Sequence, residues 1–267
     1  MKLGIVGHGF VGSAIDQGFT RDCNKFIVDP KHSHHSIKDL VEFDPAAVFV
    51  SVPTPQSSTG EADVSTLTDV LSQLNQLKDR MVIIKSTVPA YRLTEFQNTY
   101  KDLRIVYNPE FLTEKHYIED FRNPPMHVFG GDRTDTEWLE QLYWNHSVCR
   151  ECPVFHTDLI TASLVKYTIN SFLATKVTFF NELYDVFTRA GGEDFDRFTE
   201  IVSTDSRIGT THMRVPGNDG QRGYAGSCFP KDTAALAYYA RAILDTPFTQ
   251  LDTSIEINDR LRKLNNS

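Results

Sequence analysis

Gly7-His8-Gly9-Phe10-Val11-Gly12 decides the fold, because three glycines with G-x-G-x-x-G spacing directly follow the apolar run Lys2–Val6 and open a predicted helix. In that context the glycines let a pyrophosphate approach the helix N-terminus. Asp29 ends the next predicted strand, about 20 residues beyond Gly9, where an acid binds ribose hydroxyls and favours NAD over NADP. We therefore predict a dinucleotide site, with NAD contacts at Gly7, Gly9, Phe10, Val11, Gly12 and Asp29.

The first half of the chain alternates short apolar runs with helical patterns, which is typical of βαβ units. Strands are expected at 2–6, 26–28, 47–52, 81–85, 104–107, 127–130 and 154–156, and helices at 12–20, 65–77, 91–99 and 134–144. The pattern predicts an α/β fold, a doubly wound Rossmann-type parallel sheet that forms an NAD-binding domain over residues 1–156.

The second half reads as mainly α-helical. Helical periodicity runs from 158 to 190 and stops at Gly191-Gly192, and its apolar positions are too many for one exposed helix. Further helices are expected at 194–203, 233–244 and 249–264. We expect residues 157–267 to form a helical dimerisation and substrate domain, and the chain to be a homodimer.

Composition excludes several classes of function. The 267 residues carry a net charge of −8, without the basic patch that a nucleic-acid partner requires. The early glycines interrupt any signal-peptide core, and no apolar run reaches membrane-spanning length. Four cysteines do not make a disulfide framework. We predict a cytoplasmic protein with reduced thiols that binds neither nucleic acid nor membrane.

A reactive thiol is suggested by Gly226-Ser227-Cys228-Phe229-Pro230-Lys231-Asp232. Cys228 precedes the helix expected at 233–244, which Asp232 would cap, and both the helix N-terminus and Lys231 would favour a thiolate. The alternative is a cysteine packed as a small apolar residue.

Polar segments also follow three predicted parallel strands, at the edge where ligands bind. Ser51-Val52-Pro53-Thr54-Pro55 and Ser86-Thr87-Val88-Pro89 place Thr54 and Thr87 there, although such residues also serve ordinary turns. The third segment, 108–114 (NPEFLTE), carries Glu110 and Glu114, one of which could act as a general base. Solvated loop acids are the alternative.

Lys166 and Asn170 share one face of the long helix among apolar neighbours. Together they could stabilise an oxyanion, although a lysine at a domain boundary can also extend to solvent.

The H-x2-C-x2-C-x3-H run of His146, Cys149, Cys152 and His156 superficially resembles a zinc site. Because it leads into a predicted strand, we predict no metal.

The ordered set of motifs, including ST-V-P, NPEFL, FLATKVTFFNE at 172–182, DSRIG at 205–209 and GSCFPKD, resembles the UDP-glucose/GDP-mannose dehydrogenase family over nearly the whole chain. The resemblance implies an NAD-dependent four-electron oxidation of a nucleotide sugar, with UDP-glucose to UDP-glucuronate preferred, for polysaccharide biosynthesis. Cys228 would form a thiohemiacetal and then a thioester.

The same resemblance implies roles for the other residues. Lys166 and Asn170 would hold the oxyanion, Glu110 would assist thioester hydrolysis, and Asp232 with Thr87 would position water. Further cofactor contacts are implied at Thr54, Thr87, Glu114 and Lys231, and substrate contacts at Glu110, Phe111, Leu112, Lys166, Asn170, Arg207 and Gly226. Arg207 would reach the substrate of the neighbouring subunit.

The chain departs from the family pattern at Ala225, Lys115 and Ser163, and in a longer loop at 216–223. Family members continue past a helix like the one ending near Leu264, so we expect a short form without the C-terminal UDP-binding domain. Two alternatives remain open: a two-electron NAD-dependent dehydrogenase acting on another substrate, and an NAD-binding protein without turnover.

Overall fold

The computed structural model describes residues 1–20 and 22–264, so residues 265–267 of the predicted second domain lie outside the described residues. The chain divides into two compact units. One contains Met1–Pro55 and Ala62–Lys166, and the other contains Gln56–Glu61 and Tyr167–Ser267. The division along the chain therefore falls after Lys166, ten residues beyond the expected domain limit at 156.

A seven-stranded sheet in the order β2-β1-β3-β4-β5-β6-β7 forms the centre of the first unit. The strands are β1 (Lys2–Val6), β2 (Asn24–Val28), β3 (Ala47–Val50), β4 (Met81–Ile84), β5 (Arg104–Tyr107), β6 (His127–Gly130) and β7 (Val154–Thr157). From β1 the chain adds β2 on one side and β3 on the other, so the topological switch point lies between β1 and β3. The predicted doubly wound fold is confirmed.

The expectation of a wholly parallel sheet is wrong at one junction. β6 runs antiparallel to β5 and pairs through Tyr107 and Gly130, whereas β7 runs parallel to β6. A parallel connection needs a crossover helix of sufficient length. Between β5 and β6 the chain forms only the short helix α5 (Tyr117–Arg122), which the sequence pattern did not predict.

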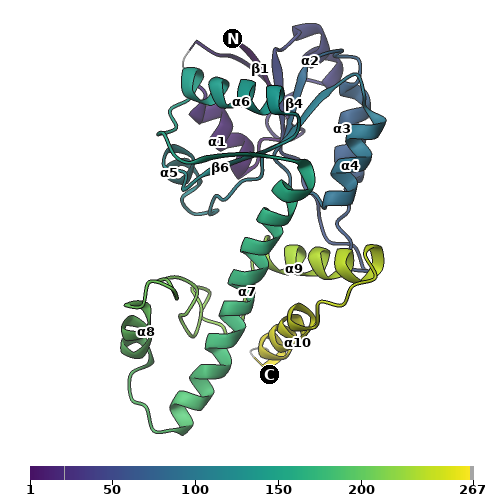
Figure 1. Cartoon of the computed structure of the whole chain (residues 1–267). Coiled ribbons are helices and arrows are strands. Elements are labelled where there is room, and N and C mark those ends of the chain that lie inside the picture. Colours follow the sequence, from purple (N-terminus) through teal and green to yellow (C-terminus); the bar gives the residue numbers. More distant parts are fainter. Residues whose placement is uncertain (21, 265–267) are drawn as a thin grey trace. The chain divides into compact units, whose positions relative to one another are not determined.

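Helices cover both faces of this sheet (Figure 1). They are α1 (Phe10–Gly18), α2 (Ile37–Phe43), α3 (Ser65–Leu74), α4 (Ala90–Thr99), α5 and α6 (Arg133–His146). Because strand side chains alternate between faces, Val48 and Val50 pack in the core with α3 and α4, while Ala47 and Phe49 pack with α1 and α6. The unpredicted helix α2 begins with a capping box formed by Ser36 and Asp39.

The second unit is helical. Its helices are α7 (Leu159–Arg189), whose first residues belong to the first unit, α8 (Phe195–Ser203), α9 (Phe229–Tyr238) and α10 (Thr249–Leu264), and a π-helical turn, η1 (Tyr239–Ile243), follows α9. The prediction that Asp232 caps α9 is wrong. The helix begins four residues earlier than expected, since Pro230 is well tolerated in a first turn, and Cys228 takes the N-cap position.

Two buried amide side chains hold the loop that precedes α9. Asn181 of α7 accepts a hydrogen bond from the Gly223 backbone N–H (3.1 Å), and Asn258 of α10 accepts one from the Tyr224 N–H (2.6 Å). Arg222 adds an ion pair with Asp185 of α7. These contacts fix the backbone that leads into Cys228.

No helix within the described ranges is both long and apolar enough to cross a membrane.

Candidate active site

The glycine turn after β1 has the geometry that a pyrophosphate requires. Gly7 has a φ of +86°, and a Cβ on Gly12 would lie 2.0 Å from the Gly7 carbonyl oxygen, so neither position tolerates a side chain. Gly9 occupies the N-cap of α1 without a side-chain cap, and a Cβ there would meet nothing within 4 Å. The first N–H groups of α1, at Phe10 and Val11, are therefore open to an anion.

Asp29 lies at the end of β2 beside this turn. Its carboxylate accepts hydrogen bonds from the backbone N–H groups of His8 (2.7 Å) and Lys31 (2.8 Å). Burial opposes ionisation of Asp29, but these bonds outweigh it and hold its pKa below the usual value. The turn and the ionised acid together fit the NAD predicted from the sequence.

Thr54 and Thr87 come together at the carboxyl edge of the sheet. The Thr54 hydroxyl donates to the Thr87 carbonyl oxygen (2.9 Å), and the Ser86 hydroxyl donates to the Val52 carbonyl oxygen (2.6 Å). These bonds connect the segments that follow β3 and β4. Thr54 and Ser86 therefore hold the two segments together, whether or not they also contact a cofactor.

Glu110 and Lys166 form a buried ion pair. The Lys166 Nζ donates to the Glu110 carbonyl oxygen (2.6 Å) and to its Oε1 (3.0 Å), and both side chains are buried. The other carboxylate oxygen accepts from the Leu112 N–H (2.6 Å), and the Phe111 ring lies 5.6 Å from Nζ. Desolvation offsets much of the attraction within a buried ion pair, so such a pair adds little net stability to a fold. Stability alone therefore does not explain why these two charges are buried.

Asn170 and Asp232 form a second buried pair, within the helical unit. Asn170 Nδ2 donates to Asp232 Oδ2 (2.6 Å), and Lys231 Nζ donates to Asp232 Oδ1 (2.5 Å). The backbone N–H of Asp232 donates to the Cys228 carbonyl oxygen (3.0 Å), so this pair lies one helical turn beyond the cysteine.

Cys228 itself is half-buried at the N-cap of α9, with its Sγ 3.5 Å from the Ser227 hydroxyl. A helix N-terminus favours a thiolate. None of the four cysteines, which all lie within the described residues, forms a disulfide. Gly226 has a φ of +84°, which favours glycine just before this segment.

Two predicted residues lie on the surface of their units. Glu114 is exposed in the first unit. Arg207 of the second unit is exposed and pairs with Asp205 (2.6 Å). The first unit thus groups Glu110 with Lys166, and the second groups Cys228, Asn170, Lys231 and Asp232.

Sequence reasoning missed a buried polar network of Lys85, Asn108 and Tyr143 in the first unit. Lys85 directly follows β4, is only 6% exposed, and donates to Asn108 Oδ1 (2.9 Å), which also accepts from the Tyr143 hydroxyl (2.8 Å). Burial lowers the pKa of Lys85 to about 8, against the opposing attraction of Glu110. The available signal was a lysine ending an otherwise apolar, buried strand.

The His-Cys run of residues 146–156 does not assemble as a ligand set. No group of three His, Cys, Asp or Glu side chains in ranges 1–20 and 22–264 could hold a metal ion. The Cys149 thiol donates to the Phe121 carbonyl oxygen, and burial raises its pKa to about 11. His156 Nε2 lies 3.0 Å from Glu140.

Two family models match the chain. The NAD binding domain model of the UDP-glucose/GDP-mannose dehydrogenase family matches residues 33–147, and the central domain model of the same family matches residues 160–260. The glycine turn precedes the first match, so its interpretation rests on the geometry above.

Curated relatives give the same result. The chain is 37% identical to the UDP-glucose 6-dehydrogenase of Rickettsia bellii over 196 residues, which cover 71% of this chain and 44% of the relative. It is 32% identical to the UDP-glucose 6-dehydrogenase TuaD of Bacillus subtilis, across 98% of this chain and 63% of the relative. The chain thus spans about half the length of the curated relatives it matches.

Among solved structures, a UDP-glucose dehydrogenase from Pyrobaculum islandicum superposes with a TM-score of 0.81 at 25% identity, over 97% of this chain and 68% of the other. The UDP-D-ManNAc dehydrogenase of Pyrococcus horikoshii gives the same TM-score at 19% identity, over 99% of this chain and 69% of the other, and supports the fold alone.

Proposed function

The chain belongs to the UDP-glucose/GDP-mannose dehydrogenase family, and on this premise we propose that it oxidises a nucleotide sugar, UDP-glucose before others, with NAD as its cofactor. The product is the uronic acid, UDP-glucuronate, which serves polysaccharide biosynthesis. The observation that carries the proposal is Cys228 at the N-cap of α9, one turn before the buried Asp232–Asn170 pair.

The proposed reaction removes four electrons in two steps. In the first, the C6 alcohol loses a proton and a hydride and becomes an aldehyde. Cys228 Sγ then adds to the aldehyde carbon to give a thiohemiacetal, which loses its hydroxyl proton and a second hydride and becomes a thioester. Water cleaves the thioester, releasing the carboxylate and restoring the thiol. NAD, when bound, accepts one hydride in each oxidation, so two molecules are consumed.

The buried side chains supply the electrostatics of these steps. Lys166 and the Asn170 amide donate to the oxygen that becomes negative as the carbonyl carbon is attacked. Glu110 assists attack by water on the thioester, and Asp232 with Thr87 positions the water. Glu110 is suited to this role because the Leu112 N–H and Lys166 fix both of its carboxylate oxygens.

The test is the stoichiometry of NADH. Purified protein incubated with UDP-glucose and excess NAD should release two NADH per sugar. Cys228→Ala should abolish turnover and keep NAD affinity, whereas the half-buried control Cys152→Ala should keep both. One NADH per sugar, or full activity in Cys228→Ala, would instead support a two-electron dehydrogenase. Retained NAD affinity without NADH from any nucleotide sugar would mean a binding protein without turnover.

We also propose that the chain forms a homodimer through α7. Phe172, Phe179 and Val186 recur every seven residues along this helix and are 66%, 61% and 62% exposed. Such an apolar stripe is suited to packing against a second copy. Arg207, exposed on the same unit, is proposed to reach the substrate of the neighbouring copy. Sedimentation should give a dimer, and Phe172→Glu/Phe179→Glu should give a monomer.

We also propose that the protein is cytoplasmic. The thiol of Cys228 must stay reduced to act, and the cytoplasm keeps cysteines reduced. Fractionation of cells that express the tagged chain would test this location.

A further inference from the structure

The Lys166–Glu110 pair has a limitation as an oxyanion site. Its ammonium and carboxylate lie 3.0 Å apart and are both buried, so the pair as a whole is close to neutral. A developing negative charge in a water-poor site is stabilised by preorganised donors, and a nearby positive charge adds to that stabilisation. Glu110 therefore offsets part of the charge that Lys166 is proposed to provide.

Lys85 provides a second buried positive charge near the same carboxylate. The Lys85 ammonium donates its hydrogen bond to the neutral amide of Asn108, and this bond does not cancel the positive charge of Lys85. Asn108 is fixed in turn, because its Nδ2 donates to the Val128 carbonyl oxygen (3.2 Å) and its Oδ1 accepts from Tyr143. Counted together, Lys85, Glu110 and Lys166 carry one net positive charge.

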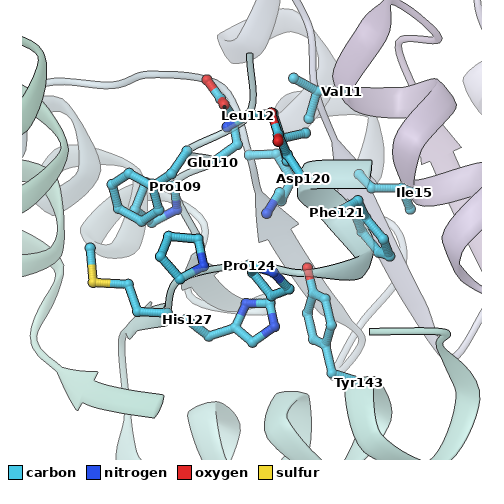
Figure 2. A pocket seen from close by; sticks show the side chains of 14 residues that line it. Val11, Ile15, Pro109, Glu110, Leu112, Asp120, Phe121, Pro124, His127 and Tyr143 are labelled. Atoms are coloured by element: carbon cyan, nitrogen blue, oxygen red, sulfur yellow. Dashed lines mark hydrogen bonds between the residues drawn. The ribbon is translucent and has the colours of Figure 1, made fainter. Parts of the chain in front are cut away.

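Lys85 and Glu110 are brought together at a small cavity in the first unit. Both residues line it, and its volume of about 30 Å³ is enough for a water molecule. Figure 2 shows His127 and Tyr143 lining the same cavity. His127 Nε2 is buried and has no hydrogen-bond partner among the described residues, so a water in the cavity would meet an unsatisfied polar group in its wall. The charges of Lys85 and Glu110 interact more strongly than surface charges do, because both side chains are buried and little water screens them.

The other titratable groups around Lys85 do not change their protonation state near neutral pH. Burial, reinforced by Lys85, lowers the pKa of His127 to about 3, so its ring is neutral. Burial raises the pKa of Cys149 to about 11 and that of Tyr143 well above its usual value. Asp120 also lines the cavity, and its half-buried carboxylate accepts two hydrogen bonds from the exposed Thr113, where water partly screens it.

We propose that Lys85 is a positioning residue that compensates the Glu110 carboxylate across the cavity and so leaves the charge of Lys166 available to the oxyanion. This role rests on the proposed function. Lys85 touches neither substrate nor cofactor in it and acts only through Glu110 and Lys166.

The kinetic test compares Lys85→Met, which keeps the length of the side chain and removes its charge, with Tyr143→Phe, which disturbs Asn108 without removing a charge. At pH 7, kcat of Lys85→Met should fall about tenfold, less than the loss of a direct oxyanion donor causes. KM for UDP-glucose and NAD should change less than about twofold, because the substitution removes no contact that binds the ground state and the transition state equally.

The pH profile separates charge from packing. Lys85 is protonated below its pKa of about 8, so kcat of the unmodified protein should fall as pH rises through about 8. That fall should disappear in Lys85→Met and persist in Tyr143→Phe. An unchanged kcat, or an alkaline fall that persists in Lys85→Met, would overturn the proposal.

A second readout needs no turnover. The 13C resonance of the Glu110 side-chain carboxyl, assigned with a Glu110→Gln/Lys166→Met variant, should inflect near pH 8 in the unmodified protein and in Tyr143→Phe, but not in Lys85→Met. No inflection between about pH 7 and 9 in the unmodified protein overturns the coupling, even if Lys85→Met fails to fold. Absence of NADH would overturn the proposed function and the effect of Lys85 on turnover, while the resonance still decides whether Lys85 and Glu110 are coupled.

Discussion

The two units bury their polar groups for different purposes. In the first, charged side chains such as Lys85, Glu110 and Lys166 lie buried near the end of an apolar sheet. In the second, the buried polar groups are mostly amides and hydroxyls, such as Asn181, Asn258 and the Thr178–Ser254 pair, which hold helices and a loop together. The first unit thus concentrates charge, and the second fixes the backbone around one cysteine.

This difference can be measured one unit at a time. Both tryptophans of the chain, Trp138 and Trp144, lie on α6 in the first unit. Their fluorescence therefore reports unfolding of that unit, and hydrogen exchange of α9 and α10 reports the other.

The largest effect should follow from breaking the buried charge pair. Glu110→Gln leaves Lys85 and Lys166 buried without their carboxylate, so we expect the first unit to lose about 3–5 kcal/mol of unfolding free energy. Urea denaturation followed by tryptophan fluorescence would measure it. The double variant Glu110→Gln/Lys166→Met should recover most of the loss, and no recovery would contradict the ion-pair explanation.

Gly12→Ala should destabilise the same unit by about 3 kcal/mol, because its Cβ would lie 2.0 Å from the Gly7 carbonyl oxygen. Gly9→Ala is the matched control, since a Cβ there meets nothing within 4 Å. It should leave the urea midpoint unchanged while weakening NAD binding, measured by calorimetry. Equal destabilisation by both variants would mean that the close approach at Gly12 is unimportant.

In the second unit, Asn170→Ala should cost about 1–3 kcal/mol, because it removes a donor from the buried Asp232 carboxylate. Hydrogen exchange of α9 should accelerate, while the tryptophan transition stays where it was. The exposed substitution Glu256→Ala on α10 is the control. A shift of the tryptophan transition would show that the units do not respond separately.

The smallest effects should come from surface ion pairs, and there the units should agree. Arg92–Glu95 in the first unit and Arg197–Glu200 in the second are solvent-accessible pairs three residues apart on helices. Glu95→Ala and Glu200→Ala should each change the unfolding free energy by less than about 0.5 kcal/mol. A larger loss in either variant would mean that surface charge also distinguishes the units.

Local patterns predicted the elements well where the apolar period was long or strict. The continuous apolar runs of β1 and β3 and the long periodicity of α7 predicted the positions of these elements to within two residues. The helices α2 and α5 were missed because seven and six residues carry too little periodicity. The family resemblance, carried by motifs along the whole chain, was confirmed.

The sequence by itself determined the doubly wound sheet, the glycine turn with Asp29, and the motifs that hold Glu110, Lys166, Asn170 and Cys228, since each depends on neighbouring residues or on regular spacing. Only the tertiary structure decided which of these meet. It pairs Lys166 with Glu110 across 56 positions and Asn170 with Asp232 across 62, and it places Lys85 against the cavity behind Glu110. Such pairings depend on how strands and helices pack, because burial forces a charged or polar group to find a partner wherever the fold brings one.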